Sequence, residues 1–314
     1  MTTDDPFGPL RSYEDSRLGI REIFLVPFVS GAETVAVLSV PLGQALPFGW
    51  VICHSFGMEQ LYLQPLEVEV ARRLASAGFP VLRFHAQGYG DSALPTDRAS
   101  FRSQVEGAIQ AANLLMESTG ASEIGFLGAR LGGTVAALAA ERIEASALAL
   151  WEPVIEGKRY VEALLRSGAV TELASRGREQ GESDLAQQLH QTGIVDVDGF
   201  PLRRAVVEEM SGIDLLREIS RFSGSSLVVQ VSRSGTERAD LRRLIGRLAS
   251  VGGRASLQIV THPLARMFGL QRYHSSRGRK ADTQGDLSEA LIWRTLAWCL
   301  ESLAPDSIRR LEGA

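Results

Sequence analysis

The chain has 314 residues, 45% of them hydrophobic, enough for one large α/β domain or two small ones. Its formal net charge is −4 with basic and acidic residues interspersed, so the sequence carries no electrostatic footprint for nucleic acid or an anionic membrane surface. The N-terminus lacks the features of a signal peptide, and no stretch approaches the ~20 apolar residues of a membrane span. We therefore expect a cytoplasmic protein with neither a nucleic-acid partner nor a membrane span.

The two cysteines, Cys53 and Cys299, have neither the spacing of metal ligands nor that of a redox pair. We expect two reduced, partly buried thiols, and the sequence predicts no metal site and no cofactor.

Strands and helices are predicted to alternate through the first half of the chain. Residues 17–29 and 34–42 are expected to form an antiparallel hairpin, because both are strand-like and the turn signal Ser30-Gly31-Ala32 lies between them. Downstream, buried apolar runs predict strands and periodic apolar residues predict helices. The expected strands are 50–54, 80–84, 123–128 and 145–151, and the expected helices are 66–78, about 98–119 and 132–140.

Residues 153–222 interrupt this alternation. They contain helical patterns, such as 160–166 and 203–210, but no convincing buried strand. The alternation then resumes with strands at 226–231 and 256–260 and helices at 239–251 and about 287–303. The sequence predicts a mostly parallel, doubly wound α/β core from residues 1–152 and 223–314, with an N-terminal antiparallel hairpin and with 153–222 as an inserted helical cap.

The segment Gly128-Ala129-Arg130-Leu131-Gly132 joins a predicted strand to a predicted helix. Its glycines have the spacing of the Gly-x-Ser-x-Gly nucleophile elbow, which turns a strand sharply into a helix and raises the central side chain above the sheet. Here the central residue is Arg130, whose permanently charged guanidinium has no proton to give up and cannot attack a substrate. The sequence therefore does not support hydrolysis by a serine at this position.

With this motif in place, the order of elements resembles the α/β-hydrolase fold over nearly the whole chain. Residues 84–92 resemble the Asp-x-x-Gly-x-Gly-x-Ser turn of that fold, with His85 at the aspartate position. Residues 53–57 resemble its His-Gly loop, which commonly supplies a backbone N–H to the oxyanion hole. The His54-x-Phe56-Gly57-x-Glu59 segment, the Arg130 elbow and residues 150–158 are similar to the hydrolase-like proteins of bacterial exosortase systems, which are grouped with serine-aminopeptidase-like hydrolases.

The resemblance also implies where a catalytic acid and base would lie. Ser234 falls near the expected position of the acid, with Glu237 as a displaced substitute. In residues 263–268, Met267 falls where such families often have histidine. The chain thus lacks a recognisable Ser-His-Asp triad, and the remaining candidates for catalysis are His54, Glu152 and His274, the last in a basic loop.

Two roles for Arg130 remain open, and they are compatible. Arg130 is neutralised by a buried carboxylate, for which Glu152 at the end of the neighbouring strand is the obvious partner, or it binds a ligand carboxylate or phosphate beside His54 or Glu59. The candidate ligand-binding residues are Arg130, His54, Ser55, Glu59, Leu131 and Glu152.

Three functions follow from these residues. The first is a non-catalytic or accessory protein that binds a small anionic or acyl ligand in a bacterial biosynthetic or export system. The second is a non-standard hydrolase or acyltransferase for an ester, thioester or amide, with Arg130 binding the oxyanion or carboxylate. The third is a module that docks a protein partner through the cap, although residues 153–222 show no long exposed apolar stripe.

Overall fold

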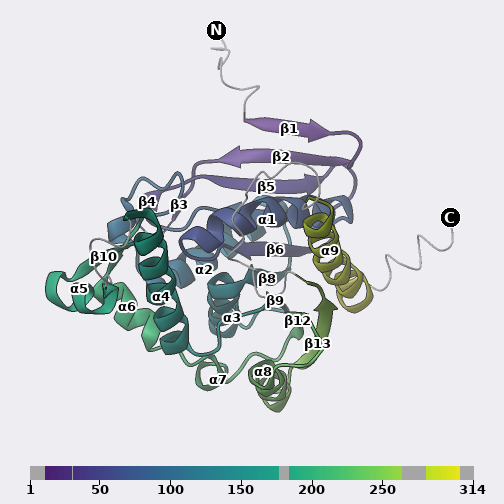
Figure 1. Cartoon of the computed structure of the whole chain (residues 1–314). Coiled ribbons are helices and arrows are strands. Elements are labelled where there is room, and N and C mark those ends of the chain that lie inside the picture. The colour runs from purple at the N-terminus through teal and green to yellow at the C-terminus, as the bar shows by residue number, and fades with distance from the viewer. Residues whose placement is uncertain (1–10, 30, 177–183, 264–280, 305–314) are drawn as a thin grey trace, which may run out of the picture.

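A central mixed sheet organises the molecule, seen here in a computed structural model that describes residues 11–29, 31–176, 184–263 and 281–304. Its strands follow the order β1-β2-β5-β7-β6-β8-β9-β12-β13 (Figure 1). From β7 to β13 neighbouring strands run parallel, whereas β1, β2 and β5 are antiparallel. The bounds are β1 Ser12–Asp15, β2 Ile20–Leu25, β5 Ala36–Pro41, β6 Phe48–Cys53, β7 Val81–Phe84, β8 Glu123–Ala129, β9 Ala147–Trp151, β12 Ser225–Ser232 and β13 Arg254–Thr261.

The predicted N-terminal hairpin is present but shorter than expected. Strands β2 and β5 pair from Ile20 opposite Pro41 to Leu25 opposite Ala36. A two-residue ladder, β3 Phe28–Val29 with β4 Ala32–Glu33, continues the hairpin toward its turn. The sequence missed β1 because this edge strand is almost wholly exposed and has no apolar alternation.

Helices cover both faces of the sheet, as a doubly wound topology requires. The alternation of side chains along β6 sends Ile52 into the core beneath α1 and α9, and Val51 into the core beneath α2, α3 and α8. Trp151 on β9 donates a hydrogen bond from Nε1 to Thr295 Oγ1 on α9, at 3.0 Å. The bounds are α1 Met58–Ser76, α2 Phe101–Thr119, α3 Arg130–Ile143, α8 Ala239–Ser250 and α9 Ala281–Leu303.

Helix α1 begins eight residues before the position predicted from the sequence. Pro65 marks a favourable helix start in sequence reasoning, yet here it lies inside the helix. The extra turns bury Glu59 and Leu63, so tertiary contacts outweigh the local cost of the proline.

The described residues of segment 153–222, which follows β9 and precedes β12 in the chain, lie outside the central sheet. The expectation of helices alone was wrong, because β10 and β11 form an antiparallel pair within it. Asp198 and Gly199 join these strands with φ values of 54° and 90°, the left-handed pair that favours Asp-Gly in tight hairpins. Figure 1 places α4, α5 and α6 together at one side of the sheet. The bounds are α4 Gly157–Arg176, α5 Leu185–Thr192, β10 Ile194–Val197, β11 Phe200–Arg203, α6 Arg204–Ser211 and α7 Leu215–Glu218.

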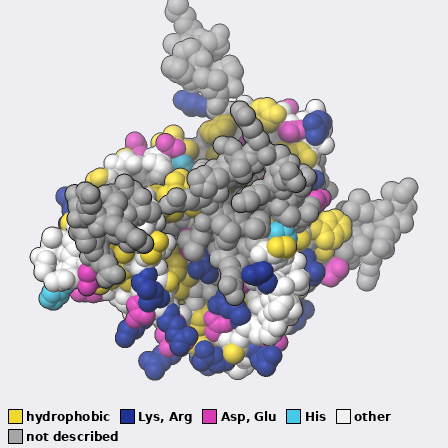
Figure 2. Space-filling view, viewed as in Figure 1, with side chains coloured by type: hydrophobic (Ala, Val, Ile, Leu, Met, Phe, Trp, Pro, Cys, Tyr) yellow, Lys and Arg dark blue, Asp and Glu magenta, His cyan; other side chains and the backbone are white. Residues whose placement is uncertain are grey.

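The surface and the cysteines add two observations. Figure 2 shows basic and acidic side chains beside one another along the lower part of the face in view. No helix within the described ranges is long and apolar enough to cross a membrane. Cys53 and Cys299 are buried and unpaired with each other, and burial raises the pKa of both thiols.

Candidate functional site

Arg130 stands at the apex of a sharp strand-to-helix turn between β8 and α3. Its φ of 53° is left-handed, which costs a residue with a side chain about 1–2 kcal/mol. The flanking glycines are required by contact. A Cβ on Gly128 would lie 2.3 Å from the Gly132 oxygen, and one on Gly132 would lie 2.3 Å from the Cys53 oxygen. The geometry of a nucleophile elbow is therefore complete, with a guanidinium in place of the nucleophile.

The carboxylate of Glu59 is the centre of the polar contacts beside Arg130. Glu59 Oε1 accepts a hydrogen bond from Arg130 Nε at 3.1 Å. Glu59 Oε2 accepts from Ser55 Oγ at 2.6 Å and from the Tyr160 hydroxyl at 3.0 Å. The Glu59 side chain is 4% exposed and that of Arg130 is 22% exposed. We name these four residues the cavity cluster; it joins the β6–α1 loop, α1, α3 and α4.

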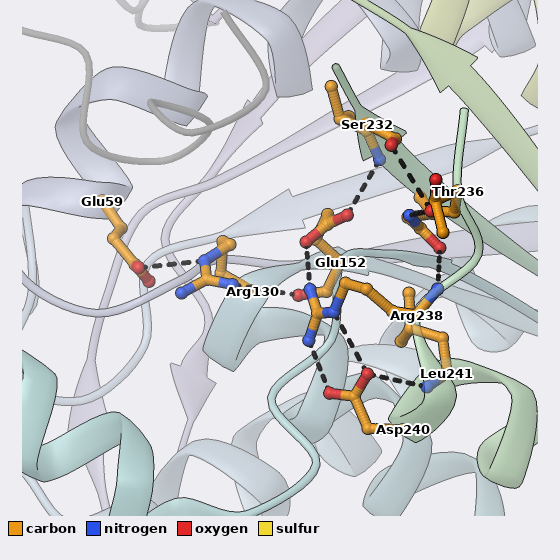
Figure 3. A network of polar contacts seen from close by, with 10 residues as sticks. Glu59, Arg130, Glu152, Ser232, Thr236, Arg238, Asp240 and Leu241 are labelled. Carbon is orange, nitrogen blue, oxygen red and sulfur yellow. Dashed lines mark hydrogen bonds and ion pairs between the residues drawn. The ribbon is translucent and has the colours of Figure 1, made fainter. Parts of the chain in front are cut away.

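The expectation that Glu152 neutralises Arg130 was wrong. Glu152 ends β9 with a φ of 49°, and its carboxylate accepts the Val231 N–H of β12 at 2.8 Å. The same carboxylate pairs with Arg238 at 2.5 Å, while Arg130 reaches only the Glu152 backbone oxygen, at 3.4 Å from Nη1 (Figure 3). The Glu152 carboxylate is therefore bound to β12 and Arg238, and it forms no ion pair with Arg130.

Arg238 bridges two carboxylates beside the loop that follows β12. Besides Glu152, it pairs with Asp240 at 2.6 Å from Nη2. We name Glu152, Arg238 and Asp240 the outer cluster (Figure 3). Ser234 and Glu237, the two positions weighed for a catalytic acid, do not join it: Ser234 bonds Thr236, and Glu237 pairs with Arg242 at 2.9 Å.

Burial and charge set the protonation states in both clusters. Burial opposes the charge of Arg130, but the Glu59 carboxylate and further neighbours outweigh it and raise the pKa of Arg130. Burial, reinforced by Glu59, raises the pKa of Tyr160 well above its usual value. Burial also raises the pKa of Glu152, against the opposing charge of Arg238. Tyr160 is therefore a neutral hydrogen-bond donor and Arg130 a fixed cation at physiological pH.

A cavity of about 60 Å³ lies beside Arg130, between the sheet and the 153–222 segment. A single water occupies ~10–15 Å³ of such a space, so the cavity suits a ligand of about four to six non-hydrogen atoms. Its walls are mainly apolar, with Arg130, Glu59 and Asp198 as the charged residues. The lining residues are Phe56, Gly57, Met58, Glu59, Arg130, Tyr160, Ala163, Leu164, Ser167, Val197 and Asp198.

His54 points elsewhere. Its Nδ1 pairs with Glu67 of α1, whose side chain is 1% exposed, and His54 is not among the residues that line the cavity. The ring centroids of His54 and His85 lie 6.0 Å apart. His85 Nδ1 accepts the Asp91 N–H at 2.9 Å, and burial, followed by the influence of His54, lowers the pKa of His85.

The remaining predicted residues divide into three groups. Ser55 and Glu59 do meet Arg130 in one cluster, whereas the Leu131 side chain is fully buried in the core, which leaves only its backbone for a ligand. His274 and Met267 lie outside the described residues. Sequence reasoning missed Tyr160 and Arg238, because neither lies in a motif. Among the side chains described, no group of three or more His, Cys, Asp or Glu could hold a metal ion.

Comparison with solved structures gives the fold a name. The chain is similar to Est1E of Butyrivibrio proteoclasticus with ferulic acid bound, at 16% identity and a TM-score of 0.59, over 90% of this chain and 99% of that one. It is also similar to an esterase of Pyrococcus furiosus, at 13% identity and a TM-score of 0.60, over 93% and 95% of the two chains. No protein-family model and no curated protein matches the sequence. The structure and these likenesses show that the chain has the α/β-hydrolase fold, with a mostly parallel central sheet and flanking helices.

Proposed function

We propose that this chain is a non-catalytic, cytoplasmic accessory protein that binds a small carboxylate or related anion at Arg130. The observation that carries the proposal is the position of Arg130 at the apex of the elbow, where the fold otherwise holds its nucleophile. A guanidinium there cannot form a covalent intermediate, but it offers planar donors that suit a carboxylate.

The contacts of Arg130 leave a binding edge on its guanidinium. Nε is committed to Glu59 and Nη1 to the Glu152 backbone oxygen, and Nη2 has no hydrogen bond to any residue that the structure describes. A ligand carboxylate placed against the Nη groups would keep the Glu59 pair intact. It would therefore avoid the cost of leaving a buried carboxylate without its cation.

The walls of the cavity indicate what accompanies the anionic group. Met58, Leu164 and Val197 contribute apolar surface to the cavity. A carboxylate with a short hydrocarbon chain would bury that chain against them while its charged end meets Arg130. In this proposal the 153–222 segment acts as a cap and supplies much of the binding surface.

The setting of the protein is inferred from sequence resemblance. The similarity of the elbow and the His54–Glu59 segment to hydrolase-like proteins of bacterial exosortase systems supports a role beside other enzymes of a biosynthetic or export system. The accessory role requires a separate catalytic protein in that system.

The test compares ligand-induced stabilisation in three proteins. Wild type and Arg166→Gln, which removes an exposed arginine of α4, should be stabilised by carboxylates such as butyrate. The charge-balanced double variant Arg130→Gln/Glu59→Gln should show no stabilisation. A ligand present at about 100 times its dissociation constant adds ~2.7 kcal/mol of stability, well within reach of a thermal-shift measurement.

Two results would overturn the proposal. Equal stabilisation of the double variant would remove Arg130 from the binding site. Turnover of p-nitrophenyl acetate or an acyl thioester that depends on Arg130 would instead establish the alternative, a non-standard hydrolase or acyltransferase that uses Arg130 as its oxyanion binder.

A further inference from the structure

The carboxylate of Asp198, on the cap side of the cavity, takes part in none of the ion pairs described above. It lies in the tight turn between β10 and β11 and lines the cavity together with Arg130. Among the described residues, Asp198 has neither an ion-pair partner nor a side-chain hydrogen bond, although it is only partly exposed. A partly buried carboxylate beside a mainly apolar cavity is stabilised when a cation binds it.

The charges around the cavity favour a ligand that carries a cation in addition to its anionic group. Arg130 is already paired with Glu59, and Asp198 adds a further negative charge, so the lining carries one net negative charge. A simple monoanion would be attracted by the Arg130 guanidinium, but it would also be repelled by the Asp198 carboxylate. A ligand that carries its own cation would satisfy both ends of the cavity.

The separation of the two charged groups limits where the ligand's cation lies. Arg130 and Asp198 line one cavity, and no ion pair joins them among the described side chains. In an α-amino acid the ammonium and carboxylate groups share one carbon, which brings both charges to one end of the ligand. A chain of two or more carbons between them fits two separated wall charges better, and the cavity has room for about four to six non-hydrogen atoms.

We propose that the ligand of this cavity is a short ω-amino carboxylate, with its carboxylate on Arg130 and its ammonium group on Asp198. This inference rests on the proposed function, because it uses the same Arg130 site. Asp198 then determines specificity for an amine at the end of the ligand opposite its carboxylate.

Butyrate and 3-aminopropanoate provide a matched pair of probes. Both have six non-hydrogen atoms, and they differ by a methyl group in place of the ammonium group. Wild type should bind 3-aminopropanoate at least about tenfold more tightly than butyrate in calorimetric titrations, a difference of ~1.4 kcal/mol.

Asp198→Asn should abolish this preference. Asparagine tolerates the left-handed backbone of the tight turn, so the fold is preserved while the charge is lost. The variant should bind butyrate more tightly than wild type does and should lose the advantage of 3-aminopropanoate. Glu208→Gln, which removes an exposed carboxylate of α6 outside the cavity lining, should keep the wild-type preference.

The outcomes separate this inference from the proposed function. Arg130-dependent binding of both probes with equal affinity, or an unchanged preference in Asp198→Asn, would overturn the ω-amino carboxylate and leave the anion site standing. Binding of neither probe to wild type would overturn both.

Discussion

The cavity cluster and the outer cluster lie next to each other and use the same chemistry, but they differ in exposure. In the cavity cluster, Glu59 and Arg130 are 4% and 22% exposed, and Tyr160 is 7% exposed. In the outer cluster, Arg238 is 40% exposed and Asp240 is 26% exposed, whereas Glu152 is only 10% exposed. Water and salt therefore screen the outer ion pairs far more than the inner one.

This difference shows that similar ion pairs contribute unequally to stability. Removing one partner of a buried pair leaves an uncompensated charge in a poorly solvated place, whereas a half-exposed partner is replaced by water at small cost. The contrast also separates the roles of the two arginines: Arg130 is held rigidly at the cavity, and Arg238 fixes the Glu152 carboxylate against β12.

The largest effect is expected from Arg130→Gln. It strands the buried Glu59 carboxylate and should lower the free energy of unfolding by about 3–5 kcal/mol, measured by urea denaturation. The double variant Arg130→Gln/Glu59→Gln should recover most of this loss, because no unpaired charge remains. Equal losses in the single and double variants would show that the Arg130–Glu59 pair is not the source of the effect.

A smaller loss is expected from Tyr160→Phe. The substitution removes the hydroxyl that donates to Glu59 at 3.0 Å and keeps the ring that packs in the core. A hydrogen bond to a charged group contributes about 1.5–3 kcal/mol, and Glu59 retains its bonds to Ser55 and Arg130. Urea denaturation should place this variant between wild type and Arg130→Gln. A loss as large as that of Arg130→Gln would mean that Tyr160, rather than the cation, holds Glu59 in the buried state.

The smallest loss, about 1 kcal/mol at pH 7, is expected from Arg238→Gln. Its pH dependence distinguishes it from the other variants. Burial raises the pKa of Glu152, so the folded state binds the Glu152 proton more tightly than the unfolded state does. The free energy of unfolding therefore falls as the pH rises above about 4.5. The charge of Arg238 opposes that rise. At Asp240, burial raises the pKa, but Arg238 outweighs burial and the pKa of Asp240 is lowered.

Without Arg238, the Glu152 pKa should rise further and the stabilisation of ionised Asp240 should be lost. The loss in Arg238→Gln should therefore be largest near pH 7 and shrink toward about pH 4 as Glu152 becomes protonated, while the part that comes from Asp240 fades only below about pH 3.8. Thermal melts of wild type and variant across this range test the prediction. A loss that is independent of pH and of salt would place Arg238 in a packing role and remove the contrast between the two clusters.

Much of the fold could be predicted from the sequence because its signals are local. Apolar runs and helical periodicity located the parallel strands and the helices between them, and the spacing of Gly128 and Gly132 predicted the elbow. The errors occur where local signals are weak: β1 has no buried face, and β10 and β11 are only four residues each. The predicted start of α1 at residue 66 was too late, because burial of the first turns outweighed the local cost of Pro65 inside the helix.

The sequence by itself determined that Arg130, and not a nucleophile, occupies the apex of the elbow, since two glycines and one central residue suffice to fix that turn. Only the tertiary structure decided which carboxylate meets Arg130. Glu59 lies 71 residues away along the chain, and Glu152 was the nearer choice by strand order. The backbone turn at Glu152 and its bond to Val231 commit that side chain to β12, and such long-range contacts depend on how separate segments pack rather than on any local pattern.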